Sequence, residues 1–198
     1  MALTPMTLTA RLIKHEHPNA KVVFIGPCAA KKLEAMRKSV RSEVDFVLTF
    51  EEMAGIFAAK HVDLTTIEED PDGVNDASTD GRSFAVGGGV AKAVVNVIQH
   101  RYPGREVKVT SSQGLRECRK MMQEAVAGKY PGYLLEGMAC PGGCIAGAGT
   151  VQPPEKSRRM LEQYEARAAL DNPLDSEYME DIELLYEDPE NWDRVSRH

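Results

Sequence analysis

The feature that most constrains this chain is the segment at residues 137–149, which reads Gly-Met-Ala-Cys-Pro-Gly-Gly-Cys-Ile-Ala-Gly-Ala-Gly. Two cysteines stand four apart there, among residues that are nearly all glycine, alanine or proline. Thiolates that bind a metal ion or an iron–sulfur cluster need backbone close to sulfur, and glycine allows this because it lacks Cβ and tolerates positive φ. A strand-like run at residues 133–136 leads into the segment. Cys140 and Cys144 are therefore predicted at the carboxyl end of a strand, where open α/β sheets bind ligands.

Composition indicates a soluble globular protein. The 198 residues suffice for one large domain or two small lobes, and 42% apolar with 27% charged residues is ordinary for that class. No apolar run is long enough to cross a membrane, and a net charge of −6 argues against a nucleic-acid partner. Residues 1–5 lack the features of a signal peptide, so we expect a cytoplasmic protein whose four cysteines are metal ligands or free thiols rather than disulfides.

Strand-like and helix-like segments alternate along residues 1–153. This alternation implies βαβ units, and so an α/β fold with a mostly parallel sheet flanked by helices. The acidic, polar residues 63–82 are predicted to form an exposed loop. Strands are predicted at residues 22–25, 45–49, 107–110 and 133–136. Helices are predicted at residues 8–16, from residue 31 onward, at 50–61, from the glycines at 87–89 to residue 101, and at 115–127. Thr49 is the predicted N-cap of the helix at 50–61.

The character of the sequence changes at about residue 154. Residues 155–170 are charged with helical spacing, Asn172-Pro173 interrupts them, and residues 176–187 predict a second, acidic helix. With Trp192 near the end, these helices are expected to form an arm that packs on the main body. The chain thus divides into residues 1–153, built of βαβ units, and a C-terminal helical arm at residues 154–198.

Cys28 follows a predicted strand and Gly26-Pro27, as Cys140 follows a strand. A lone cysteine of this kind is commonly a small buried hydrophobe, but the lysines at 31 and 32 would favour the thiolate, and the two interpretations balance. Three thiolates come close to the four that a cubane cluster needs. Structural zinc is the alternative, although zinc sites commonly use two close pairs, and Cys28 has no near partner. Cys118, within a predicted helix, is expected to be a free cysteine.

Two other features predict little chemistry. Glycines 87–89 precede a helix and so could bind a phosphate at its N-terminus. Their spacing is not that of a dinucleotide-binding motif, and close packing of helix on strand explains them equally well. The histidines at positions 15, 17, 61, 100 and 198 show no ligand spacing and are expected at the surface.

Two motifs together resemble signature motifs of [FeFe]-hydrogenases. They are residues 24–35, Phe-Ile-Gly-Pro-Cys-Ala-Ala-Lys-Lys-Leu-Glu-Ala, and residues 136–144, Glu-Gly-Met-Ala-Cys-Pro-Gly-Gly-Cys. The intervening region is similar to the catalytic domain of that family, and the acidic tail resembles its C-terminal helices. The resemblance covers essentially the whole chain. It identifies the chain as a part of an oxidoreductase that interconverts H₂ with protons and electrons.

The resemblance also implies a cofactor, the H-cluster, which joins a [4Fe–4S] cubane to a di-iron unit carrying CO and cyanide. Cys28, Cys140 and Cys144 would ligate the cubane, and Cys144 would also bridge to the di-iron unit. Lys31 would donate a hydrogen bond to a cyanide, since a cationic donor suits a small anionic ligand. Two further residues, Pro27 and Met138, would line the pocket. Glu34 would either support the residues of that pocket or belong to a path for protons.

The sequence departs from the family pattern in three ways. Gly26 stands where many members have methionine, and residues 147–151 replace a triple glycine. The Cys-Cys-Pro motif is absent, and with it a fourth cubane ligand and a proton-relay cysteine. We therefore expect a fragment of a longer protein that lacks the N-terminal half of the catalytic domain. Alone, it should be inactive and carry no complete H-cluster, and its partners would be that missing half and an electron donor such as ferredoxin in an anaerobe.

Alternative functions follow from the same motifs. A hydrogen sensor would keep the cluster pocket and couple it to signalling domains. A hydrogenase-like iron–sulfur assembly protein would keep the [4Fe–4S] cysteines but would not need Lys31, so the presence of Lys31 favours the hydrogenase. A structural zinc module is the third alternative.

Overall fold

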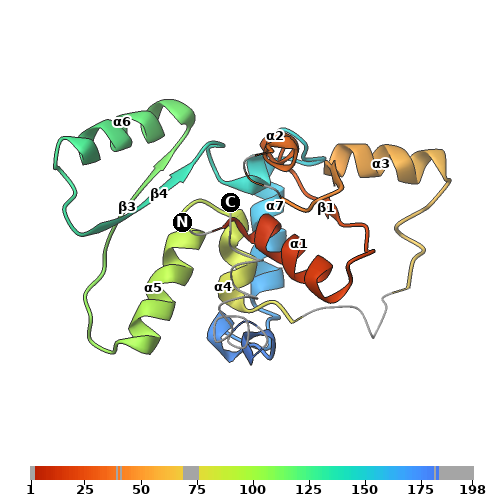
Figure 1. Ribbon diagram of the computed structural model, residues 1–198. Coiled ribbons are helices and arrows are strands. Elements are labelled where there is room, and N and C mark those ends of the chain that lie inside the picture. The colour runs from red at the N-terminus through yellow and green to blue at the C-terminus, as the bar shows by residue number, and fades with distance from the viewer. Residues whose placement is uncertain (1–2, 39, 41, 69–75, 181, 183–198) are drawn as a thin grey trace. The chain divides into compact units, whose positions relative to one another are not determined.

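The structure, a computed structural model, describes residues 3–38, 40, 42–68, 76–180 and 182. These residues divide into two compact units. The first comprises residues 3–68 with 148–151, and the second comprises residues 76–147 with 152–179. Among the described residues, no helix combines the length and apolar character needed to span a membrane. Figure 1 labels the elements of both units.

The first unit is built around a parallel βαβ motif. Strands β1 (Val23–Ile25) and β2 (Phe46–Leu48) pair in parallel, and α2 (Ala30–Met36) connects them. Two more helices complete the unit, α1 (Pro5–Glu16) and α3 (Phe50–Ala59). The predicted N-cap of α3 is confirmed: the Thr49 side chain accepts from the backbone of Glu52, whose carboxylate accepts from the backbone of Thr49.

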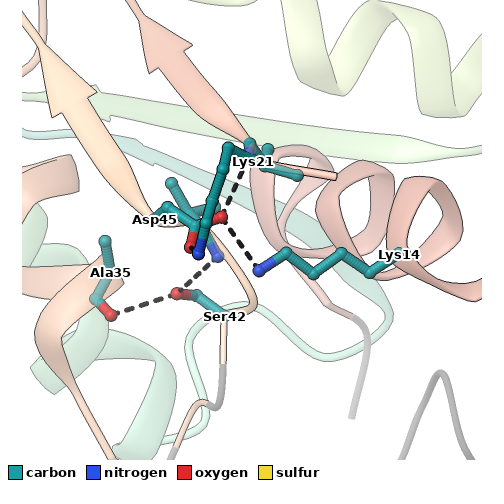
Figure 2. Close-up of polar contacts among 7 residues, drawn as sticks. Lys14, Lys21, Ala35, Ser42 and Asp45 are labelled. Carbon is teal, nitrogen blue, oxygen red and sulfur yellow. Dashed lines mark hydrogen bonds and ion pairs between the residues drawn. The ribbon is translucent and has the colours of Figure 1, made fainter. Parts of the chain in front are cut away.

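Asp45 links several segments of this first unit (Figure 2). Its carboxylate accepts from Lys14 on α1 at 2.9 Å, from Lys21 at 3.1 Å and from the Val22 amide at 2.9 Å. The hydrogen bond from Lys14 and that from the Val22 amide are the largest causes that hold the pKa of Asp45 well below its usual range. One charged side chain therefore ties α1 to the entries of both strands.

The second unit contains a second parallel βαβ motif. Strands β3 (Lys108–Gln113) and β4 (Tyr133–Met138) pair in parallel over their full length, and α6 (Leu115–Val126) connects them. Both α6 and α5 (Gly89–Arg101) pack on this strand pair (Figure 1). The remaining elements are α4 (Thr79–Arg82), α7 (Pro154–Glu165) and the short 3₁₀ turns η1 (Ser83–Ala85), η2 (Cys144–Ala146) and η3 (Pro173–Asp175).

A buried arginine joins the C-terminal helix α7 to α4 in this unit. The Arg82 guanidinium donates to the carbonyl oxygens of Ala77 at 2.8 Å and Tyr164 at 2.6 Å, and it lies 3.9 Å from the centroid of the Tyr164 ring. Its side chain is therefore held by hydrogen bonds and by a cation–π contact together. Nearby, the buried Asp80 carboxylate accepts from Asn96 on α5 at 2.8 and 2.9 Å.

The α/β class with parallel strand pairing is confirmed, with corrections to element boundaries. Within the described residues the strands form two separate two-stranded sheets. The predicted loop at 63–82 ends in helix α4, because the Ser78 side chain caps it by accepting from Gly81. Strands β3 and β4 continue beyond the predicted ends, and α7 stops at Glu165 rather than at residue 170. Half of the acidic helix predicted at 176–187, and Trp192, lie outside the described residues.

Candidate functional site

The Cys140–Cys144 loop lies at the carboxyl end of β4, as the sequence predicts. Gly142 and Gly143 have φ of 97° and 92°, which favours glycine at both positions. A Cβ on Gly143 would come within 2.6 Å of backbone atoms of Ala85 and Gly87, so no other residue fits. The Gly143 amide also donates to the Cys140 carbonyl at 3.0 Å. The two thiols are thus carried on a tight turn pressed against other backbone.

Sequence reasoning missed Glu136, the buried residue that stabilises this arrangement. Its side-chain carboxylate accepts from the amides of Gly88 at 2.7 Å and Ala91 at 3.1 Å, at the N-terminus of α5. An anion is stabilised there by the free amides and the helix dipole. The amides that could have bound a phosphate are therefore occupied by a residue of the same unit. The pairing of an acidic strand residue with a glycine-rich helix start was the available signal.

Gln113, the last residue of β3, was also missed. Its Oε1 accepts from the Gly142 amide at 2.6 Å, so it reaches the middle of the cysteine loop. Nothing in the local sequence distinguishes this residue from a surface glutamine. Only the parallel pairing of β3 with β4 brings it beside the loop.

Cys118 lies within α6, as predicted, and forms no disulfide. Its Sγ is 3.4 Å from the Ser112 carbonyl oxygen and 3.5 Å from that of Met138. A Cβ on Gly137 would lie 3.3 Å from the same sulfur. This thiol therefore fills the space between α6 and the ends of both strands.

Cys28 belongs to the first unit, where it follows β1 and precedes α2. Lys31, in the first turn of α2, donates to Glu34 at 2.7 Å, and both side chains are about three-quarters buried, with 23% and 22% of their surface exposed. The hydroxyls of Thr4 and Thr7 on the α1 side donate to the other Glu34 oxygen. Burial alone would raise the pKa of Glu34, but the hydrogen bonds from Lys31 and Thr4 outweigh it and lower that pKa. Lys31 therefore has a fixed, charged partner.

The segment after the second cysteine motif, residues 148–151, also belongs to the first unit. The Gly149 amide donates to the Pro27 carbonyl at 3.0 Å, and its own carbonyl accepts from Glu51 at 3.2 Å. A Cβ on Gly149 would come within 2.5 Å of the Thr49 side chain. The backbone just before Cys28 is thus fixed by residues that follow Cys144 in the sequence.

The structure groups the proposed site residues by unit. Cys140 and Cys144 share one loop with Met138 just before it, whereas Pro27, Cys28, Lys31 and Glu34 lie together in the first unit. In the described part of the chain, no three histidine, cysteine, aspartate or glutamate side chains form a metal-binding group. A ligand set drawn from both motifs therefore stays a prediction.

Comparison with known proteins decides the family. The protein family described as "Iron only hydrogenase large subunit, C-terminal domain" matches residues 1–148 of this chain. This chain belongs to that family. The iron-only hydrogenase resemblance seen in the two cysteine motifs is thereby confirmed.

The relatives of this chain include both hydrogenases and an iron-sulfur assembly component. The chain is 29% identical to the periplasmic [Fe] hydrogenase large subunit of Nitratidesulfovibrio vulgaris, over 72% of this chain and 42% of that protein. It is 26% identical to cytosolic iron-sulfur assembly component 3 of Mus musculus, over 88% of this chain and 45% of that protein. An [FeFe]-hydrogenase structure from Chlamydomonas reinhardtii shares the fold, with a TM-score of 0.63 and 18% identity, over 93% of this chain and 64% of that one. The chain spans less than half the length of these two curated relatives.

The donor set of this iron-only hydrogenase domain fits an iron–sulfur group. Thiolates are the usual ligands of such clusters, and Cys140 and Cys144 are partly exposed on a turn that has one proline and two glycines between them. Cys28 is likewise partly exposed at a strand end.

Proposed function

We propose that this chain forms the cluster-binding part of an iron-only hydrogenase that interconverts H₂ with protons and electrons. Cys28, Cys140 and Cys144 would hold a [4Fe–4S] cubane, and Cys144 would also bridge to a di-iron unit. Together these groups make up the H-cluster, which supplies the redox chemistry when bound. Family membership and two glycine-supported cysteine motifs support this proposal.

The ion pair of Lys31 with Glu34 is the observation that favours hydrogen chemistry over simple cluster storage. A lysine ammonium has three N–H donors, and the described contact with Glu34 uses one of them. The remaining donors can bind a small anion such as cyanide. Glu34 would keep the ammonium aimed, while Pro27 and Met138 would exclude water from the pocket.

The second candidate function is iron–sulfur cluster assembly or storage. It is favoured by the similarity to the cytosolic iron-sulfur assembly component, which extends over 88% of this chain. In that case the three cysteines would bind the cubane, and Lys31 would have no ligand to hold. A hydrogen sensor would use the same residues as the hydrogenase and differ in its attached domains. We place the protein in the cytoplasm; fractionation tests this, since the hydrogenase relative is named as periplasmic.

Anaerobic reconstitution with iron and sulfide tests cluster binding directly. Chemical analysis gives the iron and acid-labile sulfide bound per chain. The electron paramagnetic resonance spectrum of the reduced protein identifies the type of cluster. We expect a labile cubane signal that Cys28→Ser, Cys140→Ser or Cys144→Ser each removes. Cys118→Ser is the matched control and should leave it intact. Zinc bound in place of iron, or a cluster that survives all three substitutions, would overturn the proposal.

Addition of a synthetic di-iron precursor separates the two candidate functions. Infrared spectra of its cyanide ligands should shift on binding, and Lys31→Met should remove that shift, while Lys32→Met on the same helix should not. An assembly protein would bind the cubane but give no Lys31-dependent shift. Because three cysteines leave one iron of the cubane without a thiolate, the 198-residue chain should show no sustained H₂ evolution with a strong reductant.

A further inference from the structure

The Gln113 side chain reaches the segment between the two cysteines of the second motif. Its Oε1 accepts from the Gly142 amide at 2.6 Å, while its amide group lies against Gly87, where a Cβ would come within 2.5 Å of Nε2. The Gly87 amide in turn donates to the Gly142 carbonyl at 3.4 Å. Both peptide groups of Gly142 are therefore anchored, one to Gln113 and one to the backbone beside it.

The simplest interpretation is that the exposed Gln113 side chain only provides a hydrogen-bond acceptor for the Gly142 amide. The position of Gln113 indicates a further role, because Gly142 is one of the two positive-φ glycines that together set the direction of the chain between Cys140 and Cys144. A glycine with φ near 97° has no side chain to restrain it, so an outside acceptor is needed to hold its peptide plane. A change in that plane would alter the separation and direction of the two sulfurs.

We propose that Gln113 is a positioning residue for the Cys140–Cys144 thiolate pair. It acts through the Gly142 amide and is not itself proposed as a ligand. Groups that orient metal ligands in this way commonly change metal affinity by about 10- to 100-fold when they are removed. The inference rests on the proposed function only in requiring that the thiolate pair bind a metal.

The test uses the full chain and cobalt(II) alone as the probe, under anaerobic conditions. The sulfur-to-cobalt charge-transfer band reports thiolate coordination, and amide hydrogen exchange at Gly142 reports the hydrogen bond itself. Gln113→Met removes the acceptor with little change in size, and Gln113→Glu keeps an acceptor oxygen. Gln123→Met, on an exposed glutamine of α6, is the matched control. Thermal unfolding by circular dichroism verifies that each variant is folded.

We expect Gln113→Met to weaken cobalt binding about tenfold and to speed Gly142 exchange, with Gln113→Glu restoring both. A folded Gln113→Met variant with unchanged Gly142 exchange or unchanged cobalt affinity would overturn the inference. Fast exchange of the Gly142 amide in Gln113→Glu would also overturn the inference, because that variant keeps an acceptor oxygen at position 113. If the unaltered chain shows no charge-transfer band, the proposed function fails, and Gly142 exchange still decides whether Gln113 holds the loop.

Discussion

The two cysteine motifs are held by different physical means. The loop that carries Cys28 follows a three-residue strand and leads into a helix whose first turn carries the ion pair of Lys31 with Glu34, while the ion pair of Asp45 with Lys14 lies at the opposite end of that strand. The loop that carries Cys140 and Cys144 follows a six-residue strand and is fixed by glycine packing and backbone hydrogen bonds. Ion pairs therefore contribute to the first arrangement beside the packing of Gly149, whereas the Cys140–Cys144 turn is held by close backbone packing and uncharged hydrogen bonds.

This difference fits different roles for the two motifs. Close backbone packing fixes positions within tenths of an ångström, which suits thiolates that must match a rigid cluster. Ion pairs on long side chains tolerate movement, which would suit Lys31 if it holds an exchangeable anionic ligand as the proposed function requires. Substitutions that act on one mechanism should therefore leave the other motif unaffected.

The largest expected effect is that of Gly143→Ala in the second motif. Its φ of 92° and ψ of −164° lie in a region almost restricted to glycine, and the new Cβ would clash with backbone. Strain and overpacking together should cost roughly 4 kcal/mol in urea unfolding. Gly128→Ala, at a φ of 85° with open space around it, is the control and should cost about 1 kcal/mol. Equal losses at the two positions would show that packing against residues 85–87 does not restrain the loop.

Glu136→Ala should give the next largest loss of stability. The substitution leaves the amides of Gly88 and Ala91 without their acceptor at a buried helix start, which costs about 2 kcal/mol. Glu117→Ala, in the exposed first turn of α6, should change stability by less than about 0.5 kcal/mol. A Glu136→Ala variant as stable as its control would mean that the helix N-terminus is satisfied in another way.

The same contrast explains how much could be predicted from sequence. The βαβ order, the class of fold and the placement of Cys140 and Cys144 at a strand end followed from apolar periodicity and glycine content, which are local properties. Gln113 and Glu136 could not be predicted, because their contacts depend on the pairing of β3 with β4 and on α5 packing beside β4. The Asp45 contacts with Lys14 and Val22 likewise join residues that are distant in sequence.

Glu34→Gln should produce a smaller change, confined to the first motif. The variant removes the charged partner of Lys31 while keeping an acceptor for Thr4 and Thr7, and partly exposed ion pairs of this kind contribute about 1 kcal/mol or less. Alkylation followed by mass spectrometry should show Cys28 reacting faster, with Cys140 unchanged. Glu51→Gln, on an exposed glutamate of α3, is the matched control. Faster alkylation of Cys140 would contradict the independence of the two motifs.

The last prediction has the smallest effect at neutral pH and concerns how the stability of the first unit changes as the pH falls. The hydrogen bond from Lys14 and that from the Val22 amide lower the pKa of Asp45 below its unfolded value of about 3.9. A group whose pKa is lowered by folding stabilises the folded state above that unfolded value, and its contribution is lost as the pH falls through the folded pKa. The Lys31 and Thr4 bonds that offset burial give Glu34 the same sign.

Acid below pH 4 should therefore speed hydrogen exchange in the strands of the first unit before it speeds exchange at Gly142 and Gly143, whose contacts involve backbone and an uncharged glutamine. In Asp45→Asn the first unit should exchange faster at neutral pH, and its exchange should depend less on acid. Asp175→Asn, on an exposed aspartate of the second unit, is the control and should preserve the difference between the units. An acid response that begins at Gly142 and Gly143 would place the charge-dependent contacts in the wrong motif. The contrast between the two loops would then have to be abandoned.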